Sequence, residues 1–318
     1  MQETFALGRS LSRREYDELL SRSRSSRAPR WIELDPPVVR NSYNRAGFLV
    51  KHRLAQHELF DLPALFALCR RMDPKRVGCR VGKVPIDTEF DTSVPRYNGG
   101  LSLNDLTERL EELEGYIVIS NPEYDPQYRP VIEALLAEIG LQIRAQDPHV
   151  TWYATYVFIS ARGAVTPYHM DREMNFLLQI RGTKTVFLWD PQDDEIMTPE
   201  QRDRLLAYDG DRPTYKPSFE AKAAKFDLAP GLGVHHPFIA PHLVYTGPAL
   251  SVSLAMTFRT HTSDVWTDAH RVNQRLRQMG LQPSAVRRHA LVDEAKAALL
   301  HAYRHAKNLT HASRQARA

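Results

Sequence analysis

The spacing of hydrophobic and polar positions changes near residue 150, which predicts two structurally different halves. The first half has helical patterns and one strand-like run, Tyr116–Ser120. Helices are predicted at 13–21, at 62–72 after Asp61, from Ser102 with Asp105 as a capping box, and at 130–139 with Gly140 as the stop. Leu106, Leu110 and Leu113 form the apolar stripe of the third helix. This half is predicted to be α+β.

The second half is rich in β-branched and aromatic residues between Gly and Pro turns. Strands are predicted at 150–160, 176–180, 184–189 and 250–258, with 181–183 as a tight hairpin turn. In the last run, bulky residues alternate with Ser253, Ala255 and Thr257. That alternation is typical of a barrel strand whose small side chains face a cavity. Several such antiparallel strands favour a jelly-roll barrel.

Helical spacing returns after Thr260. Ser263 is the expected N-cap of a helix that Gly280 stops, and a second helix is expected at 291–307. Thr198-Pro199 should open a short helix in the insertion between Pro191 and Pro217. Packing within the chain, a homodimer through the C-terminal helices and a DNA-reading role all remain open for the helical pair.

The predicted fold is mainly β with flanking helices (α+β), built on a double-stranded β-helix. This jelly-roll, cupin-like core carries an N-terminal α/β elaboration and a C-terminal helical pair. Four regions are expected along the chain: a mobile segment at 1–30, an α+β elaboration at 31–149, the catalytic core at 150–260 and a helical region at 261–318.

Composition narrows the class of protein. The 318 residues are 42% hydrophobic, and no apolar run approaches the roughly 20 residues of a membrane span. The first thirty residues lack the apolar region of a secretory signal. Cys69 and Cys79 are expected to be ordinary thiols, so we expect a cytoplasmic protein without membrane partners.

Basic residues gather toward both ends of the chain. Residues 259–318 hold eleven Lys or Arg against four Asp or Glu, although the net charge is only +4. Such termini can contact nucleic acid or an acidic partner. Helix-turn-helix, zinc-finger and basic-zipper signatures are absent from the sequence, so a solvated helix face is favoured and no nucleic-acid partner is expected.

One short motif carries chemistry. His169 and Asp171 are two residues apart, so on a strand they point to the same face. One imidazole and one carboxylate are two thirds of the 2-His-1-carboxylate triad that holds Fe(II) with open positions. The third ligand can come from His235, His236 or His242. His242 is favoured because it follows a proline at the entrance of a strand.

Lys184 and Thr166 extend this candidate site. A lysine directed into a barrel is costly to bury unless it meets an anion. A dicarboxylate would supply one, and Thr166 could donate a further hydrogen bond to it. The alternative is that Lys184 is a solvent-facing residue of the hairpin.

Residues 165–191 and 230–247 resemble the core and the distal-histidine strand of cupin-like jumonji-C oxygenases, a family that includes the asparaginyl hydroxylase of hypoxia-inducible factor. The resemblance implies an Fe(II)- and 2-oxoglutarate-dependent dioxygenase. It places iron on His169, Asp171 and His242. It also places the cosubstrate 2-oxoglutarate on the following residues: Thr166, Lys184, Asn175 and Tyr116.

One departure bears on the substrate. The family member that acts on hypoxia-inducible factor has an amide side chain late in its last core strand, where this chain offers Ser253, Ala255 and Thr257. The substrate of that family member is therefore not assigned to this chain, whose target can be a small molecule or a protein. Hydroxylation is expected rather than demethylation, because no methyl-lysine cage is visible. The alternatives are a non-oxidative metal-binding cupin, such as an isomerase or ligand-binding protein, and a cupin-like transcriptional regulator.

Overall fold

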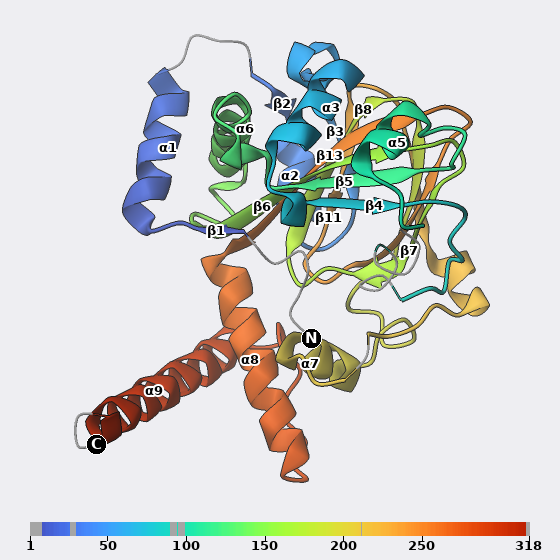
Figure 1. Ribbon diagram of the computed structural model, residues 1–318. Coiled ribbons are helices and arrows are strands. Elements are labelled where there is room, and N and C mark those ends of the chain that lie inside the picture. Colours follow the sequence, from blue (N-terminus) through green and yellow to red (C-terminus); the bar gives the residue numbers. More distant parts are fainter. Residues whose placement is uncertain (1–7, 26–29, 90–93, 95–98, 211, 316–318) are drawn as a thin grey trace. The chain divides into compact units, whose positions relative to one another are not determined.

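A computed structural model gives the structure of the chain and describes residues 8–25, 30–89, 94, 99–210 and 212–315 (Figure 1). It forms two compact units: Met1–Pro191 with Thr214–Thr260, and Gln192–Pro213 with His261–Ala318. The mobile segment predicted at 1–30 lies partly outside the described residues. Its described part includes a regular helix at Arg13–Ser25.

The first unit is built on two antiparallel sheets. In the described part of the chain, the larger has nine strands in the order β2-β3-β11-β8-β13-β6-β5-β4, with β1 paired to β6. Its strands are β1 (Arg9–Ser10), β2 (Ile32–Glu33), β3 (Phe48–His52), β4 (Val77–Arg80), β5 (Tyr116–Ser120), β6 (Val150–Ser160), β8 (Met174–Arg181), β11 (Leu232–His236) and β13 (Ser251–Thr260). The smaller sheet, of order β10-β9-β12-β7, contains β7 (Val165–Met170), β9 (Lys184–Leu188), β10 (Ala224–Leu228) and β12 (Pro241–Thr246).

An apolar core fills the space between the two sheets. The larger sheet contributes Leu177, Val234 and Ala255, and the smaller contributes Val186 and Val244 to the same cluster. The alternation of side chains along a strand explains which residues face this core. In β9, positions 184, 186 and 188 are buried, while the two positions between them are half-buried. On β13, Ala255 belongs to this core and Ser253 accepts a hydrogen bond from Lys184, so small side chains of this strand face the interior, as the sequence pattern predicts.

Short helices surround the sheets of the first unit. They are α1 (Arg13–Ser25), α2 (Pro36–Ser42), α3 (Leu62–Arg71), α5 (Leu103–Glu108) and α6 (Arg129–Ile143), with 3₁₀ turns at 54–56, 58–60, 74–76, 122–124 and 217–222. The capping box of Ser102 and Asp105 is present, but α5 ends at Glu108, before the predicted stripe is complete. Asp61 occupies the N-cap of α3 without a side-chain hydrogen bond to the helix.

The prediction that Gly140 stops a helix is wrong. Helix α6 continues through Gly140 to Ile143. A Cβ at Gly140 would lie 2.3 Å from the Tyr16 hydroxyl oxygen on α1. Gly140 therefore allows α1 and α6 to approach closely, and it does not cap the helix.

The hairpin predicted at Arg181-Gly182-Thr183 is also wrong. Strand β8 pairs with β11 and β13, whereas β9 pairs with β10 and β12, so the turn joins one sheet to the other. Gly182 has a φ of +65°, and a Cβ there would lie 2.4 Å from the carbonyl oxygen of Leu250. The sequence signal for a tight turn is correct, but the strands around it do not pair.

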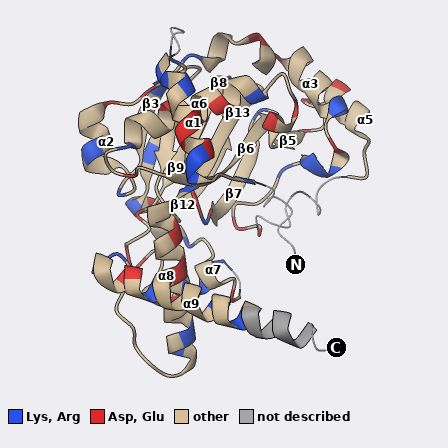
Figure 2. Cartoon of the chain, turned by 90° about the vertical axis from the view of Figure 1, so that its left-hand side faces the viewer, with Lys and Arg blue, Asp and Glu red and all other residues tan. Residues whose placement is uncertain are grey.

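The second unit is helical. It contains α7 (Pro199–Ala207), α8 (His261–Gln278) and α9 (Ala290–Gln315). Thr198-Pro199 opens α7 as predicted, and Thr198 also forms a capping box with Gln201. Ser263 lies inside α8 and is not its N-cap, because the helix follows β13 directly at His261. Acidic and basic residues are interspersed on α8 and α9 (Figure 2). Among the described residues, no helix is long and apolar enough to cross a membrane.

Candidate functional site

Two histidines face each other across neighbouring strands of the smaller sheet. His169 on β7 is the direct cross-strand partner of His242 on β12. Their ring centres are 4.0 Å apart, and both side chains are buried. Opposed residues on one face of an antiparallel pair lie close enough for their side chains to share a ligand. Strand pairing therefore brings together two histidines that are 73 positions apart in the sequence.

A β-bulge in β7 sets which side chains accompany His169. Between the pairs His242–His169 and Val244–Thr166, β7 has one residue more than β12. Simple alternation would send residues three positions apart to opposite faces. The extra residue reverses this, so Thr166 and His169 share a face. Pro167 lies in the bulge, where its missing N–H interrupts no regular pairing.

Asp171 completes a three-residue cluster just after β7. One carboxylate oxygen lies 3.7 Å from Nε2 of His169, and the other lies 4.0 Å from Nε2 of His242. One donor atom from each of the three residues lies within 4.8 Å of the others. Two imidazole nitrogens and one carboxylate oxygen are the donors of the 2-His-1-carboxylate arrangement, so the donor set fits Fe(II).

The backbone orients both imidazoles for such a role. Nδ1 of His169 lies 2.8 Å from the carbonyl oxygen of Pro167, and Nδ1 of His242 lies 3.0 Å from that of Ala240. A carbonyl oxygen only accepts, so the ring proton is on Nδ1 in each case. The Nε2 lone pair then faces the cluster. Backbone carbonyls commonly fix the tautomer of metal-binding histidines in this way.

The structure distinguishes the three histidines that competed for the third position. His235 is held elsewhere: Nδ1 donates to the carbonyl oxygen of Asn175, and Nε2 accepts the backbone N–H of Asn44. Burial lowers the pKa of His235 to about 3, so it is neutral. His236 packs against the His242 ring with centres 4.5 Å apart, yet it is not part of the cluster. The geometry favours His242.

His236 and Asn175 form a buried polar pair beside the cluster. They are cross-strand partners on β11 and β8, and both are nearly inaccessible to solvent. Both ring nitrogens of His236 and Oδ1 of Asn175 lack a hydrogen-bond partner among the described residues. Burial, followed by the neighbouring His242 and His235, lowers the pKa of His236 well below its ordinary value. Buried polar atoms without partners are rare and often mark a binding site.

Lys184 points into the interior and is not a solvent-facing residue. Its side chain is 3% exposed, and Nζ donates a 2.7 Å hydrogen bond to Oγ of Ser253 on the opposite sheet. Burial and then the charge of Arg80 lower the pKa of Lys184 to about 7. Strand β9, which carries Lys184, does not pair with β7, since β12 lies between them in the smaller sheet. Lys184 faces Thr246, four residues beyond His242 on β12.

Arg80 is a functional candidate that the sequence analysis missed. It is 3% exposed, and its Nη1 has no hydrogen-bond partner among the described residues. Its guanidinium lies over the ring of Tyr116, its cross-strand neighbour, at 4.1 Å, and Nη2 donates to the carbonyl oxygen of Val165. No sequence signal marks Arg80, because β4 is too short to be recognised and its register with Tyr116 exists only in the folded sheet.

Tyr116 and Thr166 connect the two sheets near these cations. The Tyr116 hydroxyl and Oγ1 of Thr166 are 3.1 Å apart. Arg80 and Lys184 therefore lie in one buried region with three hydroxyl groups, those of Tyr116, Thr166 and Ser253. Two buried cations without an acidic partner among the described residues are costly unless an anion joins them. The region fits a carboxylate ligand.

Comparison with solved structures finds matches at low sequence identity. The E. coli protein ycfD is 13% identical over 81% of this chain, with a TM-score of 0.42. A structure of that ribosomal oxygenase with cobalt and 2-oxoglutarate is 11% identical over 85% of the chain, with a TM-score of 0.44. The DMSP lyase DddQ from Ruegeria pomeroyi is 16% identical over 34%, with a TM-score of 0.22. The chain spans 62%, 67% and 38% of these three structures, respectively.

A family comparison gives the relationship directly. No curated protein matches the sequence. The profile of the Cupin-like domain family matches residues 98–313, which include β5 to β13 and most of the second unit. The facing antiparallel sheets agree with that assignment. The chain belongs to the Cupin-like domain family.

Proposed function

We propose that this chain is an Fe(II)- and 2-oxoglutarate-dependent oxygenase that hydroxylates its substrate. The observation that carries the proposal is the pairing of two features inside one barrel: a facial cluster of two histidines and one aspartate, and a buried pair of cations. A metal-binding cupin without a cosubstrate needs only the first. A dicarboxylate cosubstrate accounts for both.

His169, Asp171 and His242 would hold the metal. Three protein donors would leave the remaining coordination positions of the ion free for a cosubstrate and oxygen. When bound, Fe(II) with 2-oxoglutarate and oxygen supplies the oxidation of a substrate C–H bond, with succinate and carbon dioxide as the other products. The protein's part is to hold the ligands in one tautomer and to keep bulk water out of the interior.

Lys184, Thr166, Tyr116 and Arg80 would hold the far carboxylate of 2-oxoglutarate. Lys184 and Arg80 supply positive charge, and the hydroxyls of Tyr116 and Thr166 supply donors at the same end of the pocket. The unpartnered Nη1 of Arg80 supports this assignment, because a carboxylate oxygen would satisfy it. Asn175, with His236 beside it, would face the metal end of the cosubstrate.

The similarity to the hydroxylase of hypoxia-inducible factor remains a prediction, and so does the substrate class. Protein side chains and small molecules are both compatible with a buried cosubstrate site. The basic termini and the homodimer through the C-terminal helices also stay proposals. A turnover screen with peptides and small molecules would identify the substrate.

The direct test is cosubstrate turnover under controlled oxygen. Anaerobic protein loaded with Fe(II) should change its visible absorption on addition of 2-oxoglutarate, and it should form succinate once oxygen is admitted. His169→Ala is the negative control. Metal binding with neither an absorption change nor succinate above the His169→Ala level would favour the non-oxidative cupin.

A further inference from the structure

The second unit contains a cavity that the proposed oxygenase site does not use. It measures about 640 Å³ and is lined by residues of α7, α8 and α9 and by the two residues that follow α7. Its lining residues are Ala207, Tyr208, Asp209, Arg271, Gln274, Arg275, Gln278, Leu300 and Arg304. The volume lies within the range of about 300–1,000 Å³ typical of small-molecule sites. Every lining residue belongs to this unit.

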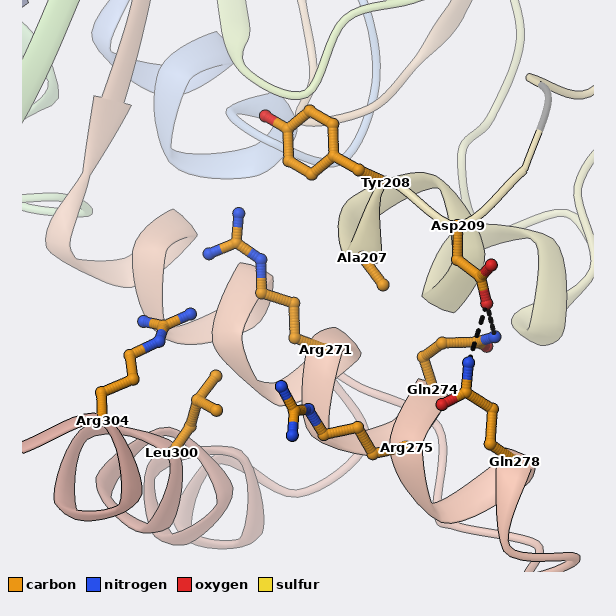
Figure 3. A pocket seen from close by; sticks show the side chains of 9 residues that line it. All are labelled: Ala207, Tyr208, Asp209, Arg271, Gln274, Arg275, Gln278, Leu300 and Arg304. Carbon is orange, nitrogen blue, oxygen red and sulfur yellow. Dashed lines mark hydrogen bonds between the residues drawn. The ribbon is translucent and has the colours of Figure 1, made fainter. Parts of the chain in front are cut away.

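Three arginines dominate the charge of this cavity. Arg271 and Arg275 come from α8 and Arg304 from α9, and their guanidinium groups approach the same space (Figure 3). One acid, Asp209, lies in the lining, and its carboxylate already accepts hydrogen bonds from Gln274 and Gln278. Guanidinium groups in this number favour a phosphate or carboxylate, which they bind with two parallel hydrogen bonds.

Two of the arginines are oriented before any ligand arrives. Asp268, largely buried behind them, pairs with Nη1 of Arg271 at 3.1 Å and with Nη2 of Arg304 at 3.2 Å. Nε of Arg271 also donates to the carbonyl oxygen of Leu206 at 3.0 Å. Fixed side chains lose little entropy on binding, so this arrangement raises affinity for an anion.

The third arginine keeps its charge available. Arg275 is exposed, and its guanidinium lies 5.3 Å from the ring centre of Tyr303. Among the residues the structure describes, no acidic side chain pairs with it. The cavity therefore has one cation whose charge no carboxylate neutralises, next to two that share a single aspartate.

Other lining residues indicate more than a simple anion. Gln274 is 7% exposed, and its Nε2 end faces Asp209, which leaves a buried Oε1 without a hydrogen-bond partner among the described residues. A buried acceptor of this kind requires a donor, such as a ligand hydroxyl or amino group. Tyr208 presents a ring that is 49% exposed at the rim, near Arg271. A flat aromatic group can stack on such a ring.

We propose that this cavity binds a nucleoside phosphate, either as a free nucleotide or as a nucleotide within a single strand of nucleic acid. The three arginines bind the phosphate, Gln274 accepts a hydrogen bond from the sugar or base, and Tyr208 stacks on the base. Inorganic phosphate satisfies only the arginines. An acidic peptide satisfies the charge but offers no flat group for Tyr208.

Binding measurements on the full chain test this proposal. The probes are adenosine monophosphate, a short single-stranded oligoadenylate, inorganic phosphate and an oligoglutamate peptide. The adenine probes should bind about tenfold or more tightly than phosphate or oligoglutamate. Affinity that is equal per nucleotide for the two adenine probes would identify a free nucleotide. Tighter binding of the oligonucleotide, with strong salt dependence, would identify nucleic acid.

Substitutions locate the binding in the cavity. Arg275→Gln removes an exposed side chain and should weaken the adenine probes about tenfold, whereas Arg288→Gln, an exposed arginine of the same unit outside the cavity, should not. Tyr208→Asn keeps a residue that tolerates the φ of +56° and should weaken the adenine probes but not phosphate. Equal binding of oligoglutamate, equal effects of Arg275→Gln and Arg288→Gln, or no saturable binding would each overturn the proposal.

Discussion

The ammonium group of Lys184 donates a 2.7 Å hydrogen bond to the hydroxyl of Ser253, which links β9 of the smaller sheet to β13 of the larger. The partner is neutral, so the bond satisfies a donor without balancing the charge. Arg80 adds a second positive charge in the same interior, and its effect on the pKa of Lys184 indicates that the two cations interact. An anion that enters here is attracted by both.

We expect Lys184 to take up a proton when 2-oxoglutarate binds. Lys184 has a pKa of about 7 in the ligand-free protein and an ordinary value of 10.5, so between these values it is largely neutral. A bound carboxylate favours the charged form. Binding above pH 7 should therefore take up protons, and affinity should fall as pH rises. Calorimetry in two buffers of different ionisation enthalpy measures the uptake, which Lys184→Met should abolish.

The same shift affects the stability of the ligand-free protein. Between pH 7 and 10.5 the unfolded chain binds more protons at Lys184 than the folded chain does, so this group makes stability rise with pH in that window. Lys184→Met removes a buried charge and should raise the free energy of unfolding at pH 6 by about 1 kcal/mol. It should also remove the increase in melting temperature that we expect on addition of 2-oxoglutarate. A variant that keeps this increase would contradict the role of Lys184.

Measurements of metal affinity should show whether His242 or His236 is the third metal ligand. His242→Ala removes a ligand and should weaken binding of Fe(II), or of Co(II) as a redox-stable probe, by about 100-fold or more. His236→Leu removes two unpartnered nitrogens, so it should leave metal affinity within a few fold and should not lower stability. The reverse pattern, measured by anaerobic metal titration, would transfer the ligand role to His236.

Arg80 offers a test of the cosubstrate end of the pocket. Arg80→Lys keeps the charge but loses the planar group that lies on the Tyr116 ring and reaches the Val165 carbonyl. We expect the KM for 2-oxoglutarate to rise about tenfold while metal affinity is unchanged. Arg76→Lys, whose guanidinium lies over Tyr124 elsewhere in this unit, is the matched control. Equal effects of the two substitutions would indicate a purely structural role.

A stability measurement tests the contact between α1 and α6. Alanine normally stabilises a helix relative to glycine by about 0.5–1 kcal/mol. At position 140 the added Cβ would meet the Tyr16 hydroxyl, so Gly140→Ala should instead cost about 1–3 kcal/mol. Tyr16→Phe removes that hydroxyl, which has no hydrogen-bond partner among the described residues. Chemical denaturation of both single variants and the double variant should show that Tyr16→Phe recovers part of the loss.

Local patterns predicted the elements of this chain well, because propensity and alternation act over a few residues. The strands at Tyr116–Ser120 and Val150–Ser160 have the predicted bounds, and the predicted capping box of Ser102 and Asp105 is present. Pairing between distant strands is not encoded locally. The turn at Gly182 was recognised, but nothing near it shows that its two strands enter different sheets.

The candidate site shows the same division. His169 and Asp171 could be selected from a short motif, because an imidazole and a carboxylate two residues apart are two of the three ligands of a known metal site. Arg80 could not, because its importance depends on a register with Tyr116 that only the folded sheet defines. The prediction about Gly140 was wrong for a related reason. A glycine that ends a helix and a glycine that allows a neighbouring helix to approach look identical in sequence.

The bulge in β7 has a consequence for the size of the ligand that the barrel can take. It places Thr166 and His169 on one face at a separation of three residues, where a regular strand allows only two or four. If His169 holds the metal and Thr166 the far carboxylate, as proposed, backbone geometry fixes the distance between these two ends of the pocket. The number of residues along one strand would then set the chain length of dicarboxylate that fits, and a single deletion or insertion at Pro167 would alter it.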